Sequence, residues 1–298
     1  MNREFTANVE KYSLNRLKEM CKLDEAVVGI VKKYIPEDCL VIDLGNELQG
    51  RMSIQDFDTM DNSLTGIVSK VGSKIFSYVD NIDEYDNTIV LNRRRLHRDY
   101  IENYLDKLPY GHIFETNVVS VAPFGLFVDM GYGVIGLLPL NDISIARLDN
   151  LRKHFNVGDY LRVIYKGKGD AGYIVSHKEL LGTWEENVAD FTEGEVTQGI
   201  VRDIKPYGAF IEITPNLTGL ADIPDGVELQ VGDSITVIFK SSNVEKQKVK
   251  LAIVKKSSMP YEIKYNYKVT SGILKEWVYT PSGSKKEVKT IFDGNCER

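Results

Sequence analysis

The sequence has little cysteine and no long apolar run. Its 298 residues contain only Cys21, Cys39 and Cys296, which are far apart and odd in number, so neither a disulfide framework nor a zinc site is expected. No apolar stretch approaches the roughly 18–20 residues that span a bilayer. The first twenty residues mix charged and apolar side chains, unlike a secretory signal. These absences predict a cytoplasmic protein with no membrane partner.

The chain also lacks an overall positive charge. Its net charge of −6 argues against a nucleic-acid partner, because basic surface drives that affinity. The charge is uneven, however: from Lys240 onward there are 13 Lys and Arg against 6 Asp and Glu, and the preceding 239 residues carry 24 against 37. The basic end is either a surface for a polyanion or a solvated tail beside acidic domains.

Motifs for catalysis are missing as well. Residues 167–172, GKGDAG, match the letters of a dinucleotide-binding loop, but that site needs a helix next. The residues that follow, GYIVSHK, have the pattern of a strand, so the glycines predict a hairpin turn. The histidines have no metal-ligand spacing: His97, His112, His154 and His177. No catalytic residue, no metal and no cofactor are therefore predicted.

The sequence does contain a segment that occurs three times. Residues 199–219 read GIVRDIKPYGAFIEITPNLTG, residues 116–136 read TNVVSVAPFGLFVDMGYGVIG, and a weaker copy at 29–50 reads GIVKKYIPEDCLVIDLGNELQG. A proline lies seven residues into each copy. A valine-glycine pair follows each, at Val71-Gly72, Val157-Gly158 and Val231-Gly232. One supersecondary unit is therefore used three times, with a period of roughly 85 residues.

Each unit has the pattern of five short strands. In the second and third units, alternating runs separated by turn residues predict five strands. A helical stretch at 146–155 in the second unit is shortened or lost in the third. This pattern is that of the OB-fold, a small Greek-key barrel. We predict an all-β protein of three tandem barrels with helical connectors, divided as follows: a helical arm at 1–24, barrels at 25–92, 110–180 and 192–256, a linker helix at 93–109, and a basic hairpin extension at 257–298.

Two aromatic pairs are the main functional signal. Phe124 and Phe127 lie in PFGLF, and Tyr207 and Phe210 lie in PYGAF. Residues three apart point to opposite faces of an ideal strand, but a glycine after the first ring permits a bulge that brings both rings to one face. The rings then form either a stacking platform for unpaired bases or part of a barrel core.

These residues resemble the S1 domain, an RNA-binding OB-fold named for the largest protein of the bacterial small ribosomal subunit. Its pattern of FGxFV, a third strand ending in S, and VGD is similar to PFGLFVDMG, VIGLLPLNDIS and VGDYLRVIY here. The resemblance covers about 25–256 and is weakest in the first unit. It implies a short S1-like protein with three S1 repeats.

The family's RNA-facing residues carry over in part. The resemblance assigns RNA contacts to the aromatics Phe124, Phe127, Tyr207 and Phe210, and to Lys248, which opens strand five of the third unit. The equivalent of Lys248 in the second unit is Gly172. The family's strand-three histidine is replaced throughout, by Ser53, Pro139 and Asp222.

The first unit departs furthest from the family. It has Asp38 and Val41 in place of the aromatics and Cys39 in place of the glycine. We therefore expect it to dock against a ribosome or a partner protein instead of binding RNA through this face.

Further cations are candidates for tracking an RNA backbone. They are Arg202, Lys205 and Lys240 in the third unit and Arg162 and Lys166 in the second. In the extension, Trp277 is expected to pack the hairpin onto the third barrel.

The sequence predicts a non-catalytic, single-stranded RNA-binding factor of translation or RNA turnover. Stacking does not register the 2′-hydroxyl, so single-stranded DNA remains an alternative. The missing histidines and the acidic first unit leave a second class open: a protein-interaction scaffold that docks to the ribosome or to RNA-processing proteins.

Overall fold

The computed structural model describes residues 11–36, 38–58, 64–83, 85, 88–146, 148, 150–169, 172–259, 261, 264–284 and 287–293. Two compact units contain them, Met1–Leu108 with Gly131–Val134, and Pro109–Met130 with Ile135–Arg298. Among the described residues, no helix is long and apolar enough to cross a membrane.

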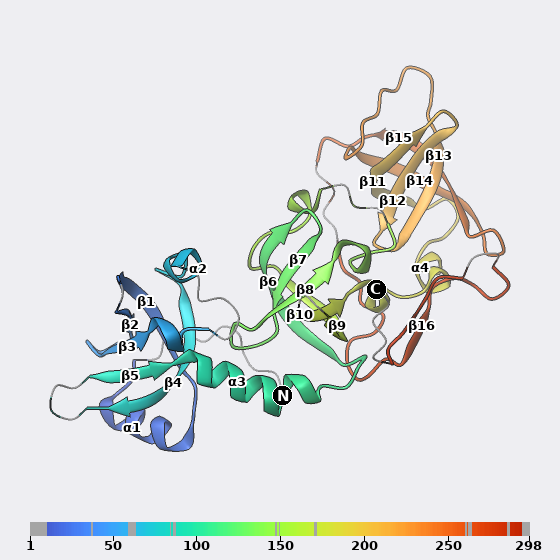
Figure 1. Cartoon of the computed structure of the whole chain (residues 1–298). Coiled ribbons are helices and arrows are strands. Elements are labelled where there is room, and N and C mark those ends of the chain that lie inside the picture. The colour runs from blue at the N-terminus through green and yellow to red at the C-terminus, as the bar shows by residue number, and fades with distance from the viewer. Residues whose placement is uncertain are drawn as a thin grey trace. The chain divides into compact units, whose positions relative to one another are not determined.

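Three closed five-stranded barrels confirm the predicted all-β fold (Figure 1). In each barrel, strands one, two and three form a meander, strand five pairs in parallel with strand three, and strand four closes the sheet against strand one. This strand order is the Greek-key arrangement of the OB-fold.

The first barrel belongs to the first unit. It consists of β1 (Val27–Ile35), β2 (Cys39–Asp43), β3 (Gln49–Ser53), β4 (Lys74–Ile82) and β5 (Ile89–Asn92), with the short α2 (Leu64–Val68) and the 3-10 helix η1 (Ile54–Asp56) between β3 and β4. The predicted arm contains α1 (Leu14–Leu23), which begins at the Ser13 cap and packs Leu17 and Met20 into the barrel core. The first ten residues of the predicted arm lie outside the described residues. The connector is α3 (Arg93–Asn103), followed by η2 (Leu105–Lys107).

The second unit contains the other two barrels. The second barrel consists of β6 (Ile113–Ala122), β7 (Gly125–Asp129), β8 (Ile135–Pro139), β9 (Tyr160–Gly169) and β10 (Gly172–Ser176). The third consists of β11 (Val196–Lys205), β12 (Gly208–Thr214), β13 (Leu217–Asp222), β14 (Ser234–Asn243) and β15 (Lys248–Lys256). Between the two barrels lie η5 (Lys178–Leu181) and α4 (Trp184–Val188), which starts with a capping box made by Thr183 and Glu186.

The predicted hairpin at 167–172 is supported by strand pairing. Gly169 pairs with Gly172 across β9 and β10, so the glycine-rich segment connects two antiparallel strands and no helix follows it. Residues 170 and 171 themselves lie outside the described residues.

The helical stretch predicted at 146–155 is shorter in the part that the structure describes. Within the described part of this stretch, only η4 (Leu151–Lys153) is helical, a single 3-10 turn that begins at the Asn150 cap. Leu151 and Phe155 are both buried. One turn is enough to direct both side chains into the protein, so the apolar spacing did not require a longer helix.

Valine-glycine pairs close all three barrels in the same way. Each glycine lies at the turn before strand four and donates its N–H, at 2.8 Å, to a carbonyl of strand one: Gly72 to Val31, Gly158 to Val118, and Gly232 to Val201. The same strand-one residues donate in return to the carbonyls of Ser73, Asp159 and Asp233 at 2.9–3.0 Å. The register of strand one against strand two shifts directly after these residues, leaving one unpaired residue in each barrel: Lys32, Val119 and Arg202.

The extension forms the predicted hairpin from β16 (Glu276–Val278) and β17 (Lys289–Ile291). Trp277 is buried and packs into the apolar core of the third barrel together with Tyr279. This confirms packing as the role of Trp277. The basic extension is therefore folded against the barrels where it is described, not a solvated tail.

We expect Gly158→Ala to lower the free energy of unfolding by about 1 kcal/mol. Gly158 has φ +96°, and a Cβ there would meet nothing within 4 Å, so the cost is backbone strain, partly offset by the stiffer unfolded chain. Gly158→Asn should lose less, because asparagine tolerates this region. Urea unfolding followed by tryptophan fluorescence measures both; an alanine variant as stable as the parent contradicts the prediction.

Candidate nucleic-acid interface

The two aromatic pairs lie on the outside of their barrels. Phe124 is 58% exposed and Tyr207 is 62% exposed, while Phe127 and Phe210 are half-buried. The rings of each pair meet edge to face, with centroids 5.9 Å apart in the second barrel and 6.3 Å apart in the third. In each pair the more exposed ring is supported edge to face by its partner, and its exposed surface is available for base stacking.

The rings come together for a different reason from the one predicted. The bulge expected at the glycine is absent, because β7 and β12 run in regular register through Gly125 and Gly208, and the shifts lie on strand one. Phe124 and Tyr207 instead lie in the turn before the strand, where the strand's alternation does not apply.

At both positions glycine is needed because the backbone of the neighbouring strand lies too close for a side chain. A Cβ would lie 2.4 Å from the Leu138 carbonyl oxygen at Gly125, and 2.5 Å from that of Ala221 at Gly208.

On each of these two barrels, strand pairing places the second ring of the aromatic pair in a row of outward-facing side chains. In the second barrel, Phe127 pairs with Leu137, which pairs with Ile174. In the third, Phe210 pairs with Leu220, which pairs with Lys250. The row on the second barrel is thus apolar throughout. The row on the third barrel ends in Lys250, a cation that the sequence analysis did not assign to the RNA-binding face. The position of Lys250 beside Leu220 follows only from the register of the parallel strands β13 and β15.

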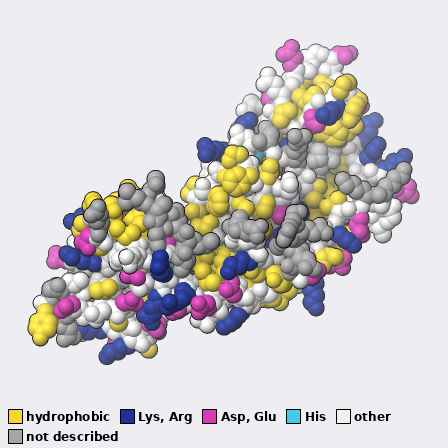
Figure 2. Space-filling view, in the orientation of Figure 1, with side chains coloured by type: hydrophobic (Ala, Val, Ile, Leu, Met, Phe, Trp, Pro, Cys, Tyr) yellow, Lys and Arg dark blue, Asp and Glu magenta, His cyan; other side chains and the backbone are white. Residues whose placement is uncertain are grey.

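Exposed lysines surround the third platform. Lys248 and Lys250 lie two residues apart on β15 and share one face. Lys240 is the unpaired residue of a bulge in β14. Lys205 is exposed beside Tyr207 and forms a solvent-exposed ion pair with Asp203 at 2.9 Å. Figure 2 shows Lys and Arg side chains next to hydrophobic ones over the strands of this barrel.

Arg202 does not have the surface position that the sequence suggested. It is 8% exposed, and its Nε donates to Glu212 Oε2 at 2.6 Å. Its Nη1 lies 3.0 Å from Nε2 of His154. Burial raises the pKa of Glu212, and the charge of Arg202 opposes that rise. The bulge on β11 turns Arg202 toward Glu212, so this arginine neutralises a buried acid and is not a free cation.

Arg162 and Lys166 are also engaged within the protein. Arg162 pairs with Glu115 at 2.8 Å and lies over the Tyr267 ring. Lys166 and Lys178 both contact the Asp142 carboxylate, at 2.9 and 2.7 Å. These contacts place both residues in intramolecular ion pairs, and their role along an RNA backbone stays a prediction.

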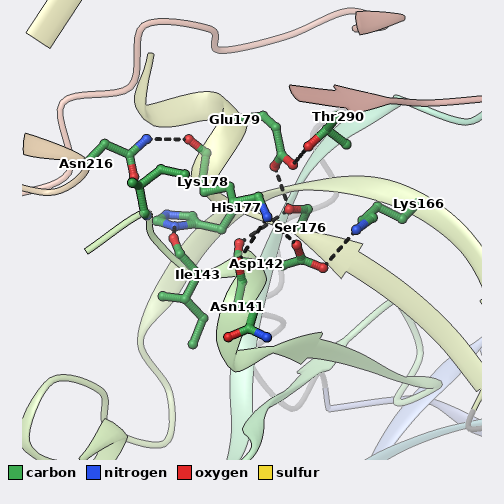
Figure 3. Close-up of polar contacts among 11 residues, drawn as sticks. Asn141, Asp142, Ile143, Lys166, Ser176, His177, Lys178, Glu179, Asn216 and Thr290 are labelled. Atoms are coloured by element: carbon green, nitrogen blue, oxygen red, sulfur yellow. Dashed lines mark hydrogen bonds and ion pairs between the residues drawn. The ribbon is translucent and has the colours of Figure 1, made fainter. Parts of the chain in front are cut away.

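A polar network next to Asp142 connects the second barrel to the third and to the extension (Figure 3). Glu179 is fully buried and accepts hydrogen bonds from the hydroxyls of Ser176 and Thr290, at 2.5 and 2.8 Å. Asn216 of the third barrel donates to the Lys178 carbonyl at 2.7 Å. No spacing in the sequence pointed to this network, because its members come from three distant segments.

His177 within this network is neutral. Complete burial lowers its pKa to about 4. Its Nδ1 lies 2.7 Å from the Ile143 carbonyl oxygen and its Nε2 lies 3.1 Å from the Tyr267 hydroxyl. Only a proton on Nδ1 lets the ring donate to that carbonyl and accept from that hydroxyl. This buried imidazole is a structural element of the unit.

The described residues of the first barrel form no such platform. Val41 occupies the place of the second ring, and it pairs with Lys33 on β1 and Arg51 on β3. Cys39 is buried beside it, and burial raises the pKa of its thiol. This face offers cations around small apolar side chains and no ring on which a base can stack.

Comparison with known proteins agrees with this architecture. Residues 107–175 match the model of the S1 RNA binding domain. The small ribosomal subunit protein bS1 of Staphylococcus epidermidis is 27% identical over 84% of this chain, which spans 66% of that protein. The 4-hydroxy-3-methylbut-2-enyl diphosphate reductase of Fusobacterium nucleatum is 26% identical over 98% of this chain and 36% of its own length.

Among solved structures, a multidomain protein with nucleic acid binding domains from Streptococcus pneumoniae covers 78% of this chain and 74% of its own, at 12% identity and a TM-score of 0.26.

The barrels and their paired outer rings define a protein of tandem OB-folds. Its second barrel matches the S1 family directly, and the other two repeat the same strand order and closure. The second barrel is similar to the S1 RNA binding domain over residues 107–175, and the chain as a whole is similar to the ribosomal protein bS1.

We expect Glu212→Ala to cost about 3–5 kcal/mol of stability, because it leaves the buried Arg202 guanidinium without its counter-charge. Asp203→Ala is the matched control, since it breaks an exposed pair with Lys205 and should cost at most about 1 kcal/mol. Denaturant unfolding of both variants measures the difference. Equal stability losses would contradict the assignment of Arg202 as a buried structural cation.

Proposed function

We propose that this protein binds single-stranded RNA through its second and third barrels, without catalysis. The observation that carries the proposal is the exposed ring on each of these barrels, which a half-buried second ring supports edge to face. Phe124 and Tyr207 expose more than half of their surface, although an aromatic side chain in water forgoes about 1.5–3 kcal/mol of burial. A base that stacks on the ring recovers such a contact, and every base has a face that fits.

Phosphate binding is the second component. Among the described residues, neither Lys248 nor Lys250 forms an ion pair or a side-chain hydrogen bond, and both are exposed on the face of β15 that adjoins Phe210. A strand whose bases stack on Tyr207 and Phe210 passes its phosphates close to these lysines. Lys240 and Lys205 border the same barrel, whereas Arg202 is buried against Glu212, and Arg162 and Lys166 are already paired with Glu115 and Asp142.

The setting of this activity is translation or RNA turnover in the cytoplasm. The similarity to bS1, a ribosomal protein, supports it, and the ribosome or RNA-processing proteins are the partners it suggests. The chain spans only 36% of the reductase it matches, so that similarity supports no enzymatic role. The first barrel, with Val41 between Lys33 and Arg51, supplies docking to the ribosome or a partner in place of stacking.

Tyr207→Ala and Phe210→Ala should each weaken binding of a short uridine oligonucleotide by about 1–3 kcal/mol. Phe124→Ala and Phe127→Ala should do the same in the second barrel. Tyr160→Ala is the control, because Tyr160 is 58% exposed and lies outside both pairs. Fluorescence anisotropy measures affinity, and a melting curve on each variant tests folding.

Unchanged affinity in folded variants of both pairs would refute the stacking mechanism. If the rings instead filled the cores, their removal would lower stability by about 3–5 kcal/mol. A matched deoxyuridine oligonucleotide tests whether the protein distinguishes RNA from DNA.

Lys248→Ala and Lys250→Ala should weaken binding at low salt, with the effect shrinking as salt rises. Each lost phosphate contact flattens the slope of log affinity against log salt by about 0.7 for a single strand. Lys22→Ala, an exposed lysine on α1, controls for the change in net charge. Identical slopes for all three variants would place the phosphate contacts elsewhere.

A further inference from the structure

Asp222 lies beside the aromatic platform of the third barrel. It is the last residue of β13 and is exposed. Its neighbour Ala221 points into the core with no exposed surface, so Asp222 points outward on the same side as Leu220. Ala209 pairs with Ala221, which puts Asp222 opposite Gly208, the residue directly after Tyr207.

The equivalent position is occupied differently in the other barrels. Pro139 pairs with Gly125 in the second barrel, and Ser53 pairs with Cys39 in the first. Only the third barrel therefore combines exposed rings with a carboxylate at this position. Within the described residues Asp222 has no ion-pair or hydrogen-bond partner; the nearby Lys205 pairs with Asp203 instead.

A carboxylate repels phosphates, so by charge alone it is a poor neighbour for RNA. A base that stacks on Tyr207, however, presents its edge and not its phosphate toward the end of β13. A carboxylate only accepts hydrogen bonds, so it selects bases by the donors on that edge. Lys205, on the other side of Gly208, offers a cation to the backbone of the same nucleotide.

We propose that Asp222 makes the third barrel prefer guanine, by accepting hydrogen bonds from N1–H and the N2 amino group of a base stacked on Tyr207. Guanine alone presents two adjacent donors that match the two carboxylate oxygens. Adenine and cytosine present one amino group next to a ring nitrogen that accepts, and uracil presents one N–H between two carbonyls. This preference rests on the proposed function, because it needs a base on the ring.

The test uses the full chain carrying Phe124→Ala and Phe127→Ala, so that binding reports the third barrel. The probes are a uridine heptamer and the same heptamer with guanosine, inosine or adenosine at its centre. The guanosine probe should bind about tenfold tighter than the uridine heptamer, as expected of a two-donor contact to a base edge. Inosine lacks the N2 amino group and should lose most of that gain.

Asp222→Asn should reduce the guanosine preference to about twofold or less, because one of the two acceptors becomes a donor. Asp225→Asn is the matched control: it removes the same charge from an exposed residue outside β13 and should leave the preference intact.

Two results would overturn the proposal. One is a guanosine preference that persists in Asp222→Asn. The other is an equal gain in affinity for all four probes in that variant, which would mean that the carboxylate only repels phosphate. Failure of the proposed function is a separate result, namely uridine binding that Tyr207→Ala does not weaken.

Discussion

A reciprocal pair of backbone hydrogen bonds holds each barrel closed, between strand one and the valine-glycine turn. The glycine donates to strand one at 2.8 Å in all three barrels, and strand one donates back to the residue just after that glycine. Strand one must pair with both strand two and strand four, and a flat strand cannot curve around both. The unpaired residue next to these bonds gives the strand its bend. The outer faces of strands two, three and five then keep the same register from barrel to barrel.

The three barrels share this backbone arrangement, and a few differences in side chains give each barrel a different outer surface. The first barrel carries Val41 and Arg51, the second carries two phenylalanines over an apolar row, and the third adds Lys250 and Asp222 around its rings. A change on the outer face leaves the core untouched, because side chains alternate along each strand. One fold therefore presents three chemically different outer faces within a single chain.

The distribution of paired and unpaired cations resolves the conflict between an acidic chain and a polyanionic partner. Lys166, Lys178 and Arg202 are held by buried or half-buried acids and add nothing to the surface field. Lys248 and Lys250 are exposed and have no such partner in the part of the chain that the structure describes. Net charge counts both groups alike, but only unpaired cations release counterions from RNA. RNA affinity therefore depends on the local charge next to the rings and not on the net charge of the chain.

The sequence alone determined the repeat, the five-strand pattern, the aromatic pairs and the core packing of Trp277, because these depend on local alternation, turn residues and side-chain size. Only the tertiary structure decided which cations are free and how the rings meet. Arg202 and Lys205 lie three residues apart, yet a bulge buries the first against Glu212 and leaves the second in solvent. Lys250 and Asp222 join the platform through strand pairing across the barrel. Glu179 accepts a hydrogen bond from Thr290, which lies 111 residues further along the chain. Such relations depend on register and long-range packing, which no local pattern encodes.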